Sequence, residues 1–153
     1  MAIEKLPSGT RGARLPPRLL MRLMMPVMTW FHRRAHDRFG GQELLYLHTV
    51  GAKSGQARTH PVARFDDGGG GWIVVASAGG AASHPAWYHN LVAHPDQVQA
   101  EVGGTNRRAT VRQLDGAERE AAWAVVVARA PRFEAYRTNT DRELPVLRIT
   151  PVD

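Results

Sequence analysis

Short apolar runs separated by glycine-rich turns constrain the fold of this chain most strongly. Three runs lie between residues 44 and 77, and two more lie at 97–102 and 105–114. Runs of this length, bounded by Gly, Asp or Pro, are typical of buried strands joined by tight turns. The pattern therefore predicts a sheet in which neighbouring strands run antiparallel.

The turns place the individual strands and helices. We expect six strands, at 44–47 with an end at Gly51, and then at 58–65, 72–77, 97–102, 105–114 and 144–149. The connector 66–71 is rich in residues that tolerate positive φ, so it predicts a hairpin between the second and third strands.

Helices are expected where the strand pattern stops. One begins at Pro85, with Ser83 or His84 as its cap, and ends near His94. Another begins at the capping-box-like pair Asp115 and Glu118 and runs to about residue 130. A loop or helical turn is expected at 133–141. Because the strands do not alternate with long helices, the chain is predicted to be an antiparallel α+β protein and not a Rossmann fold.

Composition sets further bounds. A chain of 153 residues without cysteine is expected to form one core without disulfides or thiol chemistry. The positive charge is uneven, with eight basic and two acidic residues in 1–40, against twelve of each in the remainder. We therefore expect a disordered basic arm at 1–14, an amphipathic basic helix at 15–40 and a neutral domain at 41–153. A neutral domain argues against a nucleic-acid partner.

The expected N-terminal helix has one apolar half. That half contains Leu19, Leu20, Leu23, Met24, Val27, Met28, Trp30, Phe31 and Ala35. Arginines occupy the other half, and Pro26 should kink or split the helix. In one interpretation the apolar half packs on the core. In the other, residues 15–38 lie on an anionic membrane surface, so that a cytoplasmic protein would sit peripherally on the inner face of the plasma membrane.

The turn at 51–58 offers the groups that an anionic ligand needs. It combines two glycines with Lys53, Ser54 and Arg58, and Lys53 is one of only two lysines in the chain. Backbone amides, an ammonium group and a guanidinium group together suit a phosphate or a carboxylate. The turn lacks the glycine spacing of a P-loop, and the alternative interpretation is an exposed basic hairpin turn.

Other parts of the sequence argue that any chemistry belongs to a cofactor. Residues 76–80 are small enough for a flat heterocycle to approach the backbone, whereas Trp87 and Tyr88 could stack on such a ring or belong to the core. His84, His89 and His94 are spaced five apart and cannot share a helix face, so no metal site is predicted. The chain has neither cysteine nor a Gly-x-Ser-x-Gly elbow, so no nucleophile is predicted.

Several motifs, in order, resemble the deazaflavin-dependent nitroreductase family over about residues 40–150. They are LLYLHTVGAKSGQARTHPV, WIVVASAGG, HPAWYHNLVAHP, and Tyr136 followed by TDRELPV. The resemblance implies a split β-barrel of the flavin-binding type with flanking helices. It also implies an oxidoreductase that transfers a hydride from reduced coenzyme F-420 to a quinone, a nitro compound or a similar acceptor. A membrane-associating N-terminal segment is a further feature of that family.

The resemblance also implies roles for individual residues. The tail phosphate of the cofactor would be held by Lys53, Ser54 and Arg58. The ring would be lined by His60, Pro61, Val62, Ala76, Ser77, Ala78 and Gly79. The pocket would be closed by Trp87, Tyr88 and Asn90. Tyr136 or Ser77 would donate a proton or hydrogen bond during catalysis, and a monomer or weak dimer is expected.

The acceptor side departs from the better-known members of that family. Ala78 stands where they have a lysine, His84 where they have an asparagine, and Asn139 where they have a tryptophan. Of the family's tyrosine cluster, only Tyr136 keeps a hydroxyl, since Ala130 and Phe133 occupy the other positions. The alternative function is therefore a non-catalytic carrier of a deazaflavin, FMN, haem or a lipid-like ligand.

Overall fold

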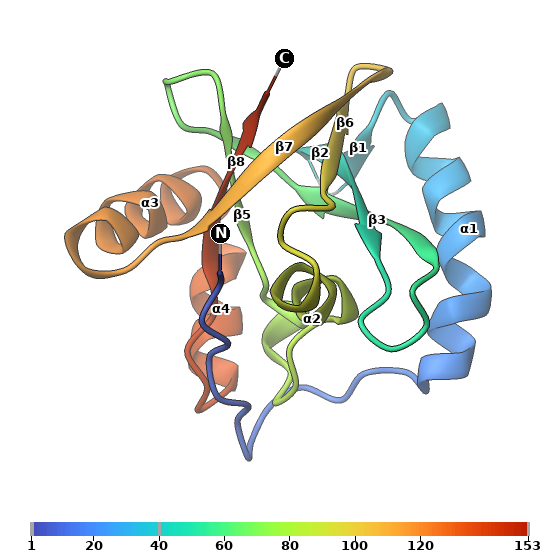
Figure 1. Ribbon diagram of the computed structural model, residues 1–153. Helices are drawn as coiled ribbons and strands as arrows, with labels where there is room; N and C mark the ends of the chain where they lie inside the picture. The colour runs from blue at the N-terminus through green and yellow to red at the C-terminus, as the bar shows by residue number, and fades with distance from the viewer. Residues whose placement is uncertain (1, 40, 153) are drawn as a thin grey trace.

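The computed structural model describes residues 2–39 and 41–152 and confirms the antiparallel α+β architecture. A curled sheet follows the order β1-β2-β6-β7-β8-β5-β4, with β3 paired to β2 (Figure 1). The strands are β1 Arg38–Phe39, β2 Gln42–Val50, β3 Ala57–Ala63, β4 Phe65–Asp66, β5 Trp72–Val75, β6 Gln99–Val102, β7 Thr105–Gln113 and β8 Val146–Pro151. The helices are α1 Arg18–Arg34, α2 Ala86–Ala93, α3 Gly116–Arg129 and α4 Arg132–Asn139, with a 3-10 turn η1 at Ala78–Gly80.

One nearly continuous strand closes the sheet into a barrel. Only Arg64 separates β3 from β4, yet β3 pairs with β2 and β4 pairs with β5. These partners lie far apart along the path of the sheet. The short β4–β5 pairing, in which Phe65 faces Ile73, is the hairpin expected from the glycine run.

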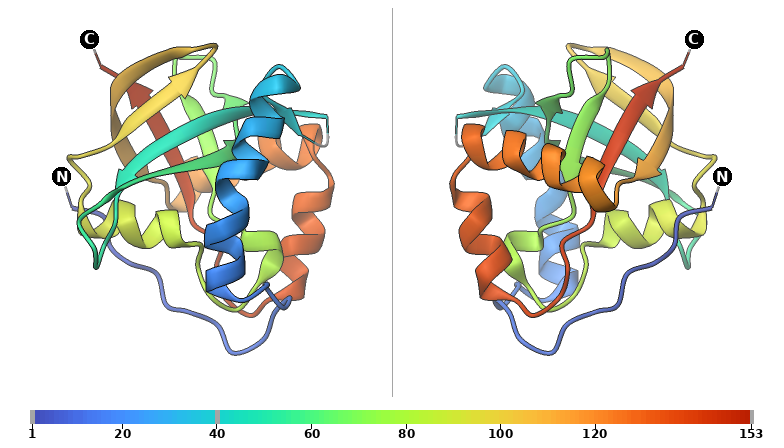
Figure 2. Two further views of the ribbon diagram at one scale, coloured as in Figure 1. Left: turned by 90° about the vertical axis from the view of Figure 1, so that its right-hand side faces the viewer. Right: turned by 90° about the vertical axis from the view of Figure 1, so that its left-hand side faces the viewer.

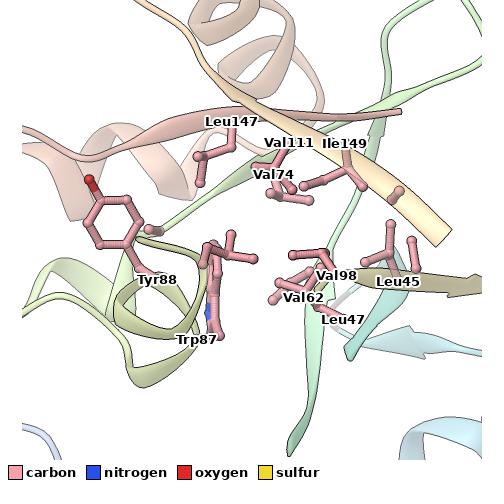
Figure 3. Close-up of a cluster of buried hydrophobic side chains, with 14 of the residues drawn as sticks. Leu45, Leu47, Val62, Val74, Trp87, Tyr88, Val98, Val111, Leu147 and Ile149 are labelled. Atoms are coloured by element: carbon pink, nitrogen blue, oxygen red, sulfur yellow. The ribbon is translucent and has the colours of Figure 1, made fainter. Parts of the chain in front are cut away.

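Two apolar clusters fill the domain. The first lies inside the barrel, where α2 contributes side chains against the strands (Figure 3). Figure 3 labels Leu45, Leu47, Val62, Val74, Trp87, Tyr88, Val98, Val111, Leu147 and Ile149. The second cluster lies where α3 and α4 cover β5 and β8, around Phe65, Trp123 and Phe133. The region 133–141, which was expected as a loop or helical turn, is thus largely helix α4.

The helix starts differ from the expected caps. Pro85 is itself the N-cap of α2, and neither Ser83 nor His84 caps it. Asp115 is the N-cap of α3, but its side chain makes no capping hydrogen bond. Glu118 instead forms ion pairs with Arg112 and Arg148 on the neighbouring strands. The predicted capping box is therefore absent, because two arginine side chains bind the Glu118 carboxylate that the capping box requires.

Residues 3–14, which we call the N-terminal strap, are ordered in the structure, in contrast to the disordered arm expected from the sequence. Ile3 is only 7% exposed and belongs to the barrel cluster. The backbone amides of Thr10 and Arg11 donate to Asp141 at 2.8 and 3.0 Å, and the Ala13 amide donates to the Gly80 carbonyl at 3.0 Å. An extended segment becomes ordered when its polar backbone finds such partners.

The N-terminal helix also departs from expectation. α1 runs without a break through Pro26, which removes one backbone donor but does not split the helix. Its apolar half is not packed on the core, so that interpretation is wrong: Leu19, Leu23 and Phe31 are 69%, 67% and 58% exposed. α1 lies on the opposite side of the barrel from α3 (Figures 1 and 2).

Polar contacts, and not the apolar half, attach α1 to the barrel. Arg33 forms an ion pair with Glu101, and its guanidinium lies 4.2 Å from the centre of the Tyr46 ring. His32 is the buried residue of the helix. In the described residues, no helix combines the length and the apolar character needed to cross a bilayer.

Candidate cofactor site

The turn after β2 is a compact hydrogen-bonded loop. The Gly51 amide donates to the Gln56 carbonyl at 2.8 Å, and the Gly55 amide donates to the Gly51 carbonyl at 3.0 Å. A side chain at position 51 would place its Cβ 2.4 Å from Ser54 Oγ, so the Ser54 hydroxyl would have to move. The loop that carries Lys53 and Ser54 is therefore fixed by its own backbone.

Asn90 ties this loop to α2. Its amide group is buried, donates to Thr49 Oγ1 at 3.0 Å and accepts the Ala52 amide at 2.9 Å. Because both ends of the side chain are engaged within the protein, Asn90 orients the loop. The structure thus gives it a supporting position behind the loop, where the sequence predicted a pocket wall.

The predicted tail-binding residues lie together at the end of the β2–β3 hairpin. Lys53 is exposed and makes no hydrogen bond or ion pair within residues 2–39 and 41–152. Arg58 Nη2 donates a long hydrogen bond of 3.4 Å to Ser54 Oγ. A lysine, a hydroxyl and an arginine that interact weakly with the protein remain available to an anion.

Strand alternation divides the predicted ring-lining residues of β3. His60 pairs with Leu47 and Val62 with Leu45, so both face the inside of the barrel, where Val62 joins the core. Pro61 pairs with Tyr46 and faces the opposite side, toward α1. The structure therefore separates Pro61 from His60 and Val62, and a single planar ligand cannot contact all three side chains from one face.

His60 carries a buried nitrogen that lacks a partner. Its Nδ1 has no hydrogen bond in the described part of the chain. Burial, and then the charge of Arg58, lower the pKa of His60 to about 4. The imidazole is therefore neutral near pH 7, and it can offer a hydrogen bond to a ligand without adding charge.

The segment after β5 presents its backbone. Ser77 has helical angles (φ −79°, ψ −38°), and Ala78, Gly79 and Gly80 follow with φ of 46°, 63° and 83°. The amides of Ser77, Ala78 and Gly79 donate no hydrogen bond to any described residue. Ala76 is buried, whereas Ser77 and Ala78 are partly exposed. This segment therefore offers unpaired backbone donors at the predicted site.

Tyr136 is brought next to this segment by α4. A Cβ on Gly80 would lie 2.6 Å from the Tyr136 carbonyl oxygen, so the backbones of η1 and α4 are in direct contact. The Tyr136 ring packs edge-on against Phe133 at 5.2 Å between centroids. The two predicted catalytic residues, Ser77 and Tyr136, are therefore carried by adjacent segments.

Arg142 was not singled out by the sequence, yet it organises this region. It is 5% exposed and donates to the carbonyls of Ala76, Ser77 and Ala81 at 3.1, 2.7 and 2.7 Å. Burial lowers its pKa to about 10, so it remains charged near pH 7 although no carboxylate pairs with it in the described residues. The only signal in the sequence was its place in the TDRELPV motif.

His84 joins Arg142 to the N-terminal strap. Arg142 Nη1 donates to His84 Nδ1 at 3.0 Å, and His84 Nε2 lies 2.9 Å from the Leu6 carbonyl. These partners require the neutral tautomer with the proton on Nε2, in agreement with the burial that lowers the pKa of His84.

The aromatic residues of α2 belong to the core. Tyr88 is fully buried, donates its hydroxyl proton to Gln113 Oε1 at 2.7 Å and accepts the Leu6 amide at 3.0 Å. Trp87 is also buried and points into the barrel cluster (Figure 3). Tyr88 therefore exposes no surface with which to close a pocket, in contrast to its predicted role.

Hollows in the surface do not coincide with the predicted site. One of about 240 Å³ is lined by Arg38, Gly41, Gln42, Glu43, Arg64, Phe65, Asp66 and Arg129. Another of about 140 Å³ lies beside β7 near Pro95 and Val152. Neither contains a predicted cofactor-binding residue, and within the described residues no group of three metal-ligating side chains is found.

Comparison with known families identifies the family of this chain. The sequence profile described as F420H(2)-dependent quinone reductase matches residues 20–151. The chain belongs to this family.

Named relatives and solved structures support this family membership. An F420H(2)-dependent quinone reductase of Mycobacterium tuberculosis H37Rv is 36% identical over 121 residues, covering 77% of this chain and 80% of that protein. The solved structure of an F420-H2 dependent reductase, FDR-A, has a TM-score of 0.62 and 38% identity, covering 69% of this chain and 92% of its own. A structure described as a domain-swapped dimer has a TM-score of 0.62 and 34% identity, covering 80% and 96% of the two chains.

Membership confirms three expectations from the sequence. The fold is that of the F-420-dependent split-barrel reductases, the chain is an oxidoreductase, and its cofactor is coenzyme F-420. The residues present fit this cofactor. The buried His60 Nδ1 and the amides of residues 77–79 have no hydrogen-bond partner in the described residues, so they can bond to polar atoms of a ligand. The side chains of Lys53 and Arg58 are cationic groups of the kind that suits an anionic tail.

The buried histidine predicts a specific pH dependence. Because the pKa of His60 is lowered to about 4, the folded protein binds fewer protons than the unfolded chain between pH 6.5 and 4. Stability is therefore lost as pH falls through that range, by about 2 kcal/mol between pH 7 and 4.5 from this residue. His60→Leu should remove that part of the slope when urea unfolding is measured at both pH values. An unchanged slope would contradict the account of His60.

Proposed function

We propose that the chain reduces a quinone with a hydride from reduced F-420, and that two sets of residues hold the cofactor. Lys53, Ser54 and Arg58 bind its anionic tail, and the segment 76–79 with His60 binds its ring. The observation that carries the proposal is that the buried His60 Nδ1 and the amides of residues 77–79 have no hydrogen-bond partner in the described residues, while Arg58 makes only a long bond to Ser54.

The protein's own contribution is positional. When bound, the deazaflavin supplies the hydride, and no protein nucleophile or metal is required. The backbone of the 51–56 turn and Asn90 hold the tail-binding loop in one conformation. Tyr136 or Ser77, on adjacent segments, donates a hydrogen bond or a proton to the acceptor oxygen as it becomes negative.

Binding and turnover together test this function. Oxidised F-420 is titrated into the purified protein while tryptophan fluorescence is followed, and oxidation of reduced F-420 is then assayed with a panel of quinones and nitro compounds. Saturable binding with quinone-dependent oxidation supports the proposal. Absence of binding at micromolar cofactor overturns it, and binding without oxidation favours the carrier alternative.

We further propose that α1 places the protein on an anionic membrane surface. Its exposed apolar half is continuous with Leu15, which is 41% exposed, and is bordered by Arg14, Arg18, Arg22 and Arg34. A basic amphipathic helix of this kind favours the interface of an anionic bilayer. Such a position, on the inner face of the plasma membrane, would suit a lipid-dissolved quinone.

Two charges on the apolar half should abolish this attachment. Leu23→Glu with Val27→Glu is expected to reduce co-sedimentation with phosphatidylglycerol vesicles by about tenfold or more, because each acidic group must leave water or repel lipid. Thr105→Glu with Ala117→Glu, at exposed sites on β7 and α3, is the charge-matched control. Equal vesicle binding by all three proteins refutes the proposal, and a concentration-dependent dimer without lipid indicates a second copy on this face.

A further inference from the structure

Two consecutive peptide groups after β5 have opposite surroundings at their two ends. The carbonyls of Ala76 and Ser77 accept hydrogen bonds from the buried guanidinium of Arg142. The amides that belong to the same two peptide groups are those of Ser77 and Ala78, and both are unpaired within the described residues. A trans peptide directs its N–H away from its carbonyl oxygen, so these amides point away from Arg142.

The backbone conformation gathers the unpaired amides. Ser77 is right-handed helical, and Ala78 and Gly79 have positive φ. Successive right- and left-handed residues form a nest, in which neighbouring N–H groups converge on one point and favour a negatively charged atom. The amides of Ser77, Ala78 and Gly79 form the candidate nest, and Gly79 is exposed, so a ligand can reach it.

The buried guanidinium of Arg142 places a positive charge behind the candidate nest. Its guanidinium is 5% exposed, and no carboxylate in residues 2–39 and 41–152 neutralises it. Hydrogen bonds that share a peptide group polarise one another, so a cation on the carbonyl makes the opposite N–H a stronger donor. A buried charge also acts through a medium of lower dielectric constant than water.

We propose that residues 77–79 form an oxyanion-binding nest for a conjugated carbonyl oxygen, and that Arg142 is the positioning residue that shapes and polarises it. This inference rests on the proposed function. A quinone that accepts a hydride gains two electrons and one proton, while reduced F-420 is oxidised by the same amount. The hydroquinone anion then takes a second proton, either from Tyr136 or Ser77 or from water. The nest stabilises the negative oxygen before that proton arrives.

The oxygen can belong to the acceptor or to a ring carbonyl of the cofactor, and the amide resonances distinguish them. In ¹⁵N–¹H spectra of the wild-type protein, oxidised F-420 alone should shift the Ser77, Ala78 and Gly79 amides downfield if the cofactor supplies the oxygen. If the acceptor supplies it, the shift should require a quinone or hydroquinone as well. Unchanged resonances under both conditions, in protein that binds F-420, overturn the nest but leave the proposed function intact.

A proline substitution removes one donor with little backbone strain. Ser77 has φ of −79°, which proline can adopt, and its amide has no partner to lose. Ser77→Pro should weaken F-420 binding or lower kcat by about tenfold relative to Ser77→Ala, which removes the hydroxyl alone. Equal behaviour of the two variants would contradict the nest.

The role of Arg142 is tested by measuring kcat and KM, because a loss of stability alone would not change their ratio in the folded protein. Arg142→Lys keeps a cation but cannot reach three carbonyls at once, so we expect kcat to fall about tenfold with a smaller change in KM. Asp141→Asn, which loosens the strap beside it, is the control for general destabilisation. If both variants lower the melting temperature and neither changes kcat, Arg142 is purely structural. If Arg142→Lys does not fold, the wild-type amide shifts decide.

Discussion

Replacing Lys53 and Arg58 together by alanine is expected to weaken the binding of oxidised F-420 by about a hundredfold, since each removes a charge-assisted hydrogen bond. The free energy of unfolding should change little, because Lys53 makes no hydrogen bond or ion pair in the described residues and Arg58 makes only the 3.4 Å bond to Ser54. Fluorescence titration at two salt concentrations measures the effect, and the wild-type affinity should fall with salt more steeply than that of the variant.

Arg107→Ala with Arg108→Ala is the matched control, because it removes the same two charges from exposed positions on β7. It should bind the cofactor almost as the wild type does. If both double variants lose affinity equally, the tail is held by the general positive charge of the protein, and the tail-binding loop has no special role.

The second large effect is expected on stability. Gly80→Ala should destabilise the fold by about 3 kcal/mol, because the new Cβ combines a left-handed backbone with a collision against α4. Its φ is 83°, and the Cβ would lie 2.6 Å from the Tyr136 carbonyl oxygen.

Gly79→Ala separates the cost of backbone strain from the cost of the collision with α4. Gly79 has φ of 63° but open space around its Cβ position, so only backbone strain, about 1 kcal/mol, is expected. Urea unfolding of both variants measures the difference. Equal losses would mean that α4 and η1 are not in the close contact that places Tyr136 beside Ser77.

The architecture was largely predictable because local signals dominate it. Glycine turns and apolar runs placed the strands of the barrel, and α3 ends at Arg129, close to the expected residue 130. The side of α1 that meets the barrel was not predictable. Periodicity identifies an apolar half, but Arg33 binds Glu101 from far along the chain and turns that half outward.

Order in the N-terminal strap was missed for a similar reason. The local sequence around Thr10 and Arg11 is typical of a disordered segment. Their order depends on Asp141, more than a hundred residues later, which accepts hydrogen bonds from both backbone amides. The candidate site shows the same limit. Sequence motifs predicted Lys53, Arg58 and Ser77 as site residues, whereas the positions of Arg142, Asn90 and Tyr88 depend on hydrogen bonds between distant segments.

A structure of the protein with F-420 bound tests the central claim most directly. The account predicts the tail phosphate at Lys53, Ser54 and Arg58 and the ring against residues 76–79. The hollow lined by Arg38, Arg64 and Arg129, together with Glu43 and Asp66, is an alternative binding site on the same molecule. A cofactor seated there, with Lys53 and Arg58 left in solvent, would contradict the assignment.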